Sequence, residues 1–156
     1  MRRRRSPKRV AMPDPKFHNI LLGKFINMVM QRGKKALAER IVYRSLAIVS
    51  EKTGKTDALE IFQKAISNAR PVLEVKSRRV GGATYQIPIE IQTERGATLA
   101  MRWIRDFAIS KKGRPMHEKL AQEIMDAYKG EGQAVKKKED THKMAEANKA
   151  FSHYRW

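Results

Sequence analysis

The chain has 156 residues, with 34 lysines and arginines against 16 aspartates and glutamates, a formal net charge of +18 and no cysteine. This length suits one domain with a hydrophobic core, and the absence of cysteine excludes disulfides, cysteine-ligated zinc and thiol catalysis. Because such a charge excess repels itself unless a polyanion is nearby, nucleic acid is the first expected partner.

Residues 1–16 are predicted to form an extended basic arm. Three prolines interrupt regular structure, and the segment carries the cations Arg2, Arg3, Arg4, Arg5, Lys8, Arg9 and Lys16. A basic arm can be a solubilising tail or a localisation signal, or it can fold against phosphates on binding. Given the charge elsewhere in the chain, we favour RNA contact.

Neither secretion nor membrane insertion is expected. No apolar run follows the basic start at the place that a signal peptide requires. The apolar segment Ile20–Met30 is interrupted by polar residues and is too short to cross a bilayer. We therefore expect a cytoplasmic protein without a membrane partner.

Three helices are predicted before residue 71. Residues 19–31 carry an apolar face and should end near Gly33, and a long helix should follow up to Gly54. The tight connection predicts that these two helices are antiparallel neighbours. The third helix should begin at Asp57, which has capping-box spacing to Glu60, and end before Pro71.

Residues 72–91 have the pattern of a two-stranded antiparallel ribbon. Leu73 and Val75 alternate with polar residues, as do the isoleucines at 87, 89 and 91, and Gly81-Gly82 lies between them. If the apolar rows share one face, Val75 must pair with an odd-numbered isoleucine, which excludes a two-residue turn and predicts a loop of three or five residues.

The ribbon's tip has a composition that no core would favour: Lys76, Arg78, Arg79, Gly81, Gly82, Thr84, Tyr85 and Gln86. An isolated two-stranded ribbon is marginal in water, so its base should pack on helices while the basic tip projects as a finger. The alternative is a surface hairpin whose charges are only solvated.

Three further helices are predicted after the ribbon. The fourth has an apolar face opposite Arg95, Arg102 and Arg105 and should end at Gly113, and the fifth should start at Pro115 and end before Gly130. Residues 134–150 contain good helix formers but few apolar side chains, so this helix needs a partner other than the core. The tail at 151–156 could stack on bases or cover the core.

The predicted architecture is a mainly α, single-domain bundle of about six helices, with one protruding ribbon between helices three and four. We expect residues 1–156 to form a single RNA-binding domain that includes the arm and a polar C-terminal segment at 134–156. The four histidines are scattered and no serine lies in a nucleophile-elbow context, so neither an enzyme, a metal site, a cofactor nor a small-molecule substrate is expected. The rival interpretations are a non-specific DNA-binding protein and a membrane-surface protein.

Several sequence blocks carry a family resemblance: Asp14-Pro15-Lys16-Phe17, Gly33-Lys34-Lys35, Arg70-Pro71, Glu74 to Gly82, Ala100-Met101-Arg102-Trp103 and Met144 to Phe151. Over nearly its whole length the chain resembles the bacterial-type ribosomal protein seven family of the small subunit. The resemblance implies a helical bundle with a protruding β-ribbon, direct binding to the 3′ major domain of small-subunit ribosomal RNA, and a role in starting assembly of the head. It also implies that the ribbon and the C-terminal helix lie near the exit-site transfer RNA (tRNA), with ribosomal proteins nine and eleven as neighbours.

The resemblance gives the ribbon role near tRNA to Arg78, Arg79, Gly81, Gly82 and Tyr85, and ribosomal RNA contact to Lys34, Lys35, Arg95, Arg102 and the N-terminal arginines. Charge and position add further residues to the expected ribosomal RNA contacts. These are Lys8, Lys16, Arg32, Lys76, Arg78, Arg79, Lys136, Lys137, Lys138, Lys143, Lys149 and Arg155.

Overall fold

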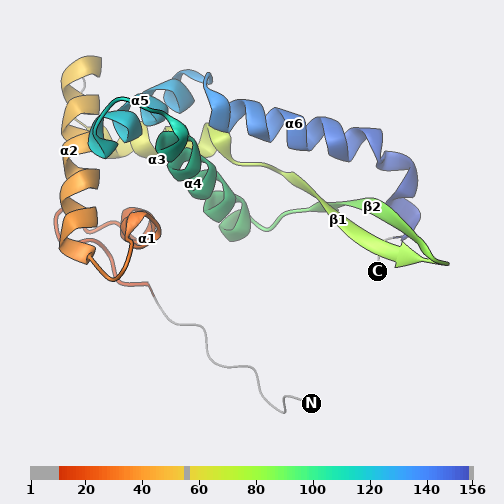
Figure 1. Ribbon diagram of the computed structural model, residues 1–156. Helices are drawn as coiled ribbons and strands as arrows, with labels where there is room; N and C mark the ends of the chain where they lie inside the picture. Colours follow the sequence, from red (N-terminus) through yellow and green to blue (C-terminus); the bar gives the residue numbers. More distant parts are fainter. Residues whose placement is uncertain (1–10, 55–56, 155–156) are drawn as a thin grey trace, which may run out of the picture.

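The computed structural model describes residues 11–54 and 57–154, and every structural statement below concerns these residues. The elements in chain order are α1 (Ile20–Val29), α2 (Lys35–Thr53), α3 (Ala58–Ala69), β1 (Leu73–Val80), β2 (Ala83–Glu90), α4 (Thr93–Ser110), α5 (Met116–Lys129), α6 (Gln133–Ala147) and the 3-10 helix η1 (Lys149–Tyr154). Figure 1 shows a helical body from which the ribbon and α6 extend together. The predicted fold class is confirmed.

The helix boundaries follow local capping chemistry. The Asn19 side chain accepts hydrogen bonds from the amides of Leu21 and Leu22 at 2.8 and 3.1 Å, and so starts α1. Asp57 starts α3 in the same way. The prediction that α4 ends at Gly113 was wrong by three residues: the helix ends at Ser110, and the following backbone is extended at Lys111.

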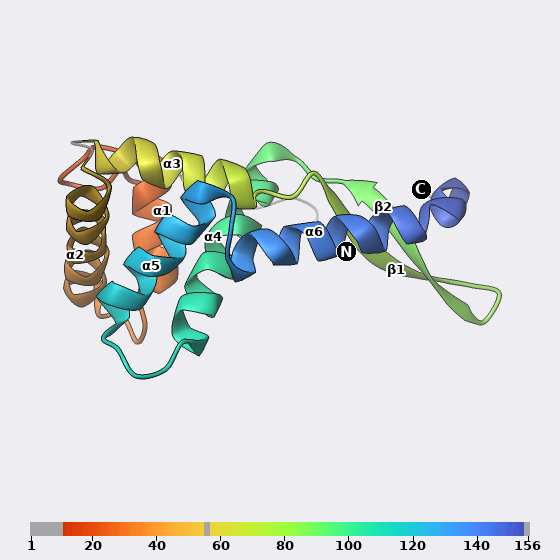
Figure 2. The ribbon, with the colours of Figure 1, turned by 90° about the horizontal axis from the view of Figure 1, so that it is seen from above.

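The first two helices cross instead of lying antiparallel, so that prediction was also wrong. In Figure 1 α1 is seen end-on while α2 lies lengthwise, and in Figure 2 the two views are exchanged. Their connection contains two successive left-handed residues, Arg32 with φ 52° and Gly33 with φ 74°. This backbone redirects the chain between the helices.

The core lies where α1 to α5 meet. Phe25 and Phe62 are fully buried, with ring centroids 5.1 Å apart in a tilted arrangement. Helix α5 contacts α2, α3, α4 and α6, and its Leu120 and Ile124 are fully buried among them. Each large apolar side chain buried in this way stabilises the fold by roughly 1.5–3 kcal/mol.

The ribbon has a two-residue turn, contrary to the predicted odd-length loop. Val80 pairs with Ala83, so only Gly81 and Gly82 connect the strands, both with positive φ as a type I′ turn requires. Val75 pairs with Pro88, and apolar residues therefore occupy both faces.

The prediction of the turn failed because it assumed that only one face of the ribbon is covered by other parts of the chain. Leu73 and Pro88 line a pocket together with residues of α6, whereas Tyr85, on the opposite face, packs against Phe151 of η1 at 5.1 Å between ring centroids. The C-terminal segment thus covers parts of both faces, and each can carry apolar side chains.

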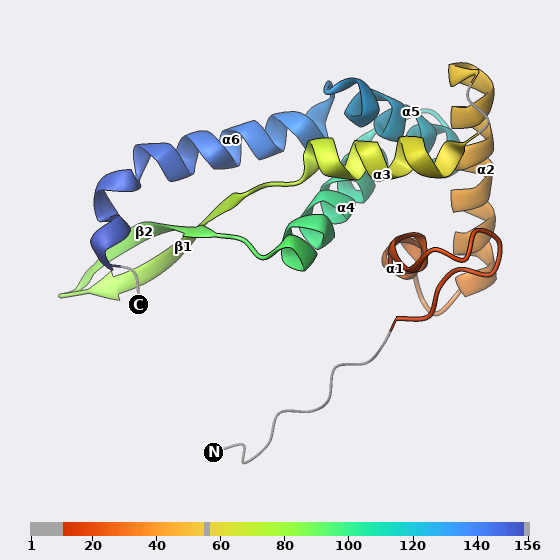
Figure 3. The same cartoon turned by 180° about the vertical axis from the view of Figure 1, so that it is seen from behind.

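Helix α6 leaves the body beside the ribbon (Figure 3). Its first turn buries Ala134 and Val135 against the body, and beyond it the helix contacts β1 and β2. The expectation that this helix needs a partner other than the core is confirmed for its distal part, where the ribbon is the partner. We call β1, β2, α6 and η1 together the projection.

Candidate nucleic-acid interface

The base of the projection is fixed by an ion-pair cluster around Glu74. Arg95, at the start of α4, donates from Nε to both carboxylate oxygens of Glu74 at 3.0 Å and from Nη2 to Oε2 at 2.8 Å. Lys76 Nζ lies 3.5 Å from Oε1. The hydrogen bonds and charge of Glu74 raise the pKa of Arg95. The guanidinium is therefore held by the fold and orients β1 relative to α4.

Two side chains of α6 also bind the base of the projection. The Val72 amide donates to His142 Nε2 at 3.0 Å, and the Val72 carbonyl accepts from the Ile91 amide at 2.9 Å. Lys138 Nζ donates to the carbonyl oxygen of Asn68 at 2.7 Å, at the end of α3. The side-chain amide of Asn68 donates to two carbonyl oxygens at the end of α5. The base of the projection is thus tied to α3, α5 and α6 together.

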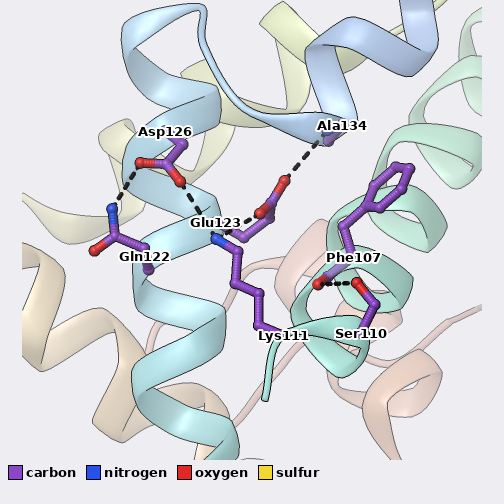
Figure 4. A network of polar contacts seen from close by, with 7 residues as sticks. All are labelled: Phe107, Ser110, Lys111, Gln122, Glu123, Asp126 and Ala134. Carbon is purple, nitrogen blue, oxygen red and sulfur yellow. Dashed lines mark hydrogen bonds and ion pairs between the residues drawn. The ribbon is translucent and has the colours of Figure 1, made fainter. Parts of the chain in front are cut away.

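A buried carboxylate fixes the start of α6 (Figure 4). Glu123 on α5 has a side chain only 1% exposed, and its Oε2 lies 2.7 Å from Lys111 Nζ. Its Oε1 accepts from the Ala134 amide at 3.2 Å, and Lys111 also reaches Asp126 Oδ2 at 3.3 Å. At Gly132 φ is 92° and a Cβ would lie 2.9 Å from the Cβ of Asp126, so the chain needs glycine there. This network positions the projection on the body.

The tip of the projection presents cations and a glycine turn. Arg78 and Arg79 lie on opposite faces, because they are consecutive residues of β1 that pair with Tyr85 and Thr84 respectively. Arg79 is exposed and Arg78 half-buried. Gly81 and Gly82 have open space around their Cα atoms, which permits close approach of another molecule.

Further cations line the projection along α6. Lys136, Lys137, Lys143 and Lys149 are exposed, whereas Lys138 is half-buried in its contact with Asn68. In the tail, Phe151 packs on Tyr85 of the ribbon and not on the core. Base stacking by the tail stays a prediction.

A second basic group lies on the body, at the connection between α1 and α2. Arg32, Lys34 and Lys35 are exposed there. Lys35 lies 3.9 Å from Glu39, one helical turn along, which is a weak surface pair. Arg102 is a further exposed cation, on α4. The described chain thus carries exposed cations on the body, at the α1–α2 connection, and on the projection, along α6. Figure 1 shows that these two segments lie apart.

The residues predicted to contact RNA differ in where the structure places them. Arg2, Arg3, Arg4, Arg5, Lys8, Arg9 and Arg155 lie outside the described residues. In the arm, Lys16 is exposed, with its Nζ 5.4 Å from the ring centroid of Phe17 and 5.5 Å from that of Tyr43. Arg95 and Lys138 are engaged within the fold.

Sequence patterns did not identify the residues that hold the projection, notably Glu74, Glu123 and His142. Each contacts a segment distant in the chain. The only available signal was a carboxylate inside a mostly apolar helix face, at Glu123.

The arrangement suits binding of a polyanion. Exposed guanidinium and ammonium groups can neutralise phosphates, and a rigid scaffold keeps their spacing. Among the described residues there is no group of three or more His, Cys, Asp or Glu side chains that could hold a metal ion. In the same part of the chain no helix is long and apolar enough to span a membrane.

Comparisons with known proteins agree with this chemistry. A profile of the family described as ribosomal protein S7p/S5e matches residues 1–149. The chain is 60% identical to small ribosomal subunit protein uS7 of Thermotoga maritima over 156 residues, covering 100% of both chains. It is 55% identical to the protein of the same name from Fervidobacterium nodosum over 156 residues, again 100% of both, and 57% identical to that of Acidithiobacillus ferrooxidans over 155 residues, 99% of both.

Proposed function

The chain belongs to the ribosomal protein S7p/S5e family, and on this premise we propose that it binds the 3′ major domain of small-subunit ribosomal RNA directly and starts assembly of the head. It is a non-enzymatic protein of the small ribosomal subunit that binds ribosomal RNA. The proposal concerns which RNA it binds and what the binding achieves.

One observation supports this most directly: exposed cations occur both on the body and on a projection braced against it. Lys34 at the α1–α2 connection and Lys143 on α6 are examples. A rigid protein that binds phosphates at separate places fixes the relative orientation of the RNA segments that carry them. Selectivity then comes from the shape of an RNA junction and its unpaired bases, since the major groove of RNA is poorly accessible.

The projection is proposed to lie near the exit-site tRNA. Its tip combines the glycine turn with Arg78, Arg79 and Tyr85, a composition suited to close approach to a sugar-phosphate backbone. Neighbouring small-subunit proteins nine and eleven are proposed as protein partners. The whole chain, residues 1–156, is proposed to act as one RNA-binding unit.

The test is binding across a salt series to the 3′ major-domain RNA, beside a plain RNA duplex and a DNA duplex of similar length. Specific binding should exceed both controls by roughly a hundredfold or more at the same salt concentration. Equal affinities with equal salt slopes would leave only a non-specific polyanion binder and overturn the proposal.

Variants test the cations on the body and those on the projection separately. Lys34→Ala and the double variant Arg78→Ala/Arg79→Ala should each weaken domain binding and lower the salt slope by about 1 per phosphate contact removed. Lys52→Ala is the matched control, because Lys52 is exposed at the opposite end of α2 from Lys34. An effect of Lys52→Ala as large as that of Lys34→Ala would mean that only total charge matters.

A further inference from the structure

An open groove of about 420 Å³ lies on the body between α1, α2, α4 and α5. Its apolar lining consists of Val29, Leu37, Ala38, Ile41, Ile109 and Met116. Its polar lining includes Arg32, Lys34 and Arg105 and contains no carboxylate among the described residues. The groove thus combines an apolar interior with a cationic rim.

The apolar side chains of this groove are accessible to a ligand. Leu37 is 46% exposed and Ile109 is 48% exposed. They come from α2 and α4, so they lie on two different walls. Large exposed aliphatic residues grouped with a groove are typical of a binding surface.

The rim contains a residue held in an unfavourable backbone conformation. Arg32 has φ 52°, in the left-handed region that side chains with a Cβ rarely adopt. Its side chain is exposed, and no residue in the described ranges forms an ion pair with it. A glycine would serve the turn better, so the guanidinium is retained at an energetic cost, which is characteristic of a functional position.

The neighbouring cations have different tasks. Arg105 Nη1 donates to the carbonyl oxygen of Met28 at 3.2 Å and its Nε donates to Asp106 at 2.7 Å, so Arg105 shapes the wall between α1 and α4. Arg32 and Lys34 lack such contacts with the described residues. They are the groups available to an anionic ligand.

The chemistry of the ligand follows from this lining. It must present a flat or apolar surface to the groove and a negative charge to the rim at the same time. A nucleotide that is not base-paired has both, since its base can leave the helix and its phosphate stays attached. An acidic peptide with an apolar side chain is the competing class, but RNA is the ligand that the proposed function supplies.

We propose that this groove binds an unpaired nucleobase of the ribosomal RNA, with Arg32 and Lys34 contacting the adjacent phosphates. The proposal rests on the proposed function and adds a base-binding site on the body to it. Such a site contributes selectivity that phosphate contacts alone do not supply.

The experiment compares Leu37→Ala/Ile109→Ala with wild type in binding to the 3′ major-domain RNA and in chemical modification of the bound RNA's bases. We expect about tenfold weaker binding, the order of one lost base contact, with an unchanged salt slope. At least one unpaired nucleotide that wild type protects should become reactive. Ile20→Ala is the matched control, since this aliphatic residue is 52% exposed and lies outside the groove.

A second variant tests the rim. Arg32→Gly should lower the salt slope by about 1 while thermal stability stays equal or rises, because glycine relieves the left-handed backbone. Wild-type affinity and base protection in Leu37→Ala/Ile109→Ala would overturn the base site, even where the domain RNA is bound specifically. Loss of specific binding by wild type itself would instead overturn the proposed function.

Discussion

Replacement of Lys111 by methionine should destabilise the protein by more than its surface position suggests. The substitution keeps the aliphatic length and removes the charge that lies 2.7 Å from Glu123. Glu123 is 1% exposed, so it would remain as a buried carboxylate with the Ala134 amide as its hydrogen-bond donor. Breaking a fully buried pair costs about 3–5 kcal/mol.

The expected cost here is smaller, because the Lys111 side chain is 31% exposed and water can partly replace it. We expect about 2–3 kcal/mol in the free energy of unfolding, measured by urea denaturation at pH 7. For a chain of this size the melting temperature should fall by roughly 4–12 °C. Lys112→Met is the matched control, since Lys112 is the exposed neighbour, and it should change stability by no more than about 0.5 kcal/mol.

A double variant tests the electrostatic reason directly. Glu123→Gln keeps an oxygen that can accept from Ala134 but removes the buried charge. Lys111→Met/Glu123→Gln should therefore recover at least about 1 kcal/mol relative to Lys111→Met alone. Equal losses for Lys111→Met and Lys112→Met, or fully additive losses in the double variant, would refute the buried-pair reasoning.

Three further predictions concern other contacts. Gly96→Ala should destabilise by about 1–2 kcal/mol in chemical denaturation, because the new Cβ would lie 3.0 Å from the carbonyl oxygen of Pro71; an unchanged midpoint would contradict this close packing. Burial, followed by the hydrogen bond and charge of Asp14, raises the pKa of Tyr43 to about 12, so the folded state retains this proton where the unfolded state loses it. The difference in unfolding free energy between wild type and Tyr43→Phe should be complete below pH 10 and decline by at most about 2–3 kcal/mol between pH 10 and 12. A difference that stays constant over this range would refute the raised pKa of Tyr43. His142→Ala should speed hydrogen exchange of the Val72 amide, which donates to His142 Nε2 at 3.0 Å, without changing exchange in α1. Equal exchange of the Val72 amide in the variant and in wild type would exclude this contact as a brace.

The sequence was sufficient to predict the elements whose determinants are local. Asn19 and Asp57 begin helices because their side chains bind amides two and three residues later. Apolar periodicity likewise identified the core face of α4 and the two strands. These features depend on residues within one turn or one strand of each other.

The failures share a different physical origin. The pairing of Val75 with Pro88 depends on α6 and η1 covering the ribbon, which strand parity cannot show. The crossing of α1 and α2 depends on Arg32 adopting a left-handed backbone, for which glycine would be the usual signal. Exposed cations such as Lys34 were predictable as candidates, but only the structure shows that Arg95 and Lys138 are engaged within the fold.

The bracing of the ribbon also sets an order for folding during synthesis. Val72 is held by His142, and Asn68 by Lys138, in each case 70 residues further along the chain. A nascent chain released to Gly130 already contains helices α1 to α5 and the contacts among them, and it lacks only the packing of α6 on α3, α4 and α5. The ribbon, although translated earlier, stays without its support until α6 has left the ribosome that makes it. The projection is therefore completed last, after the body has a core to hold it.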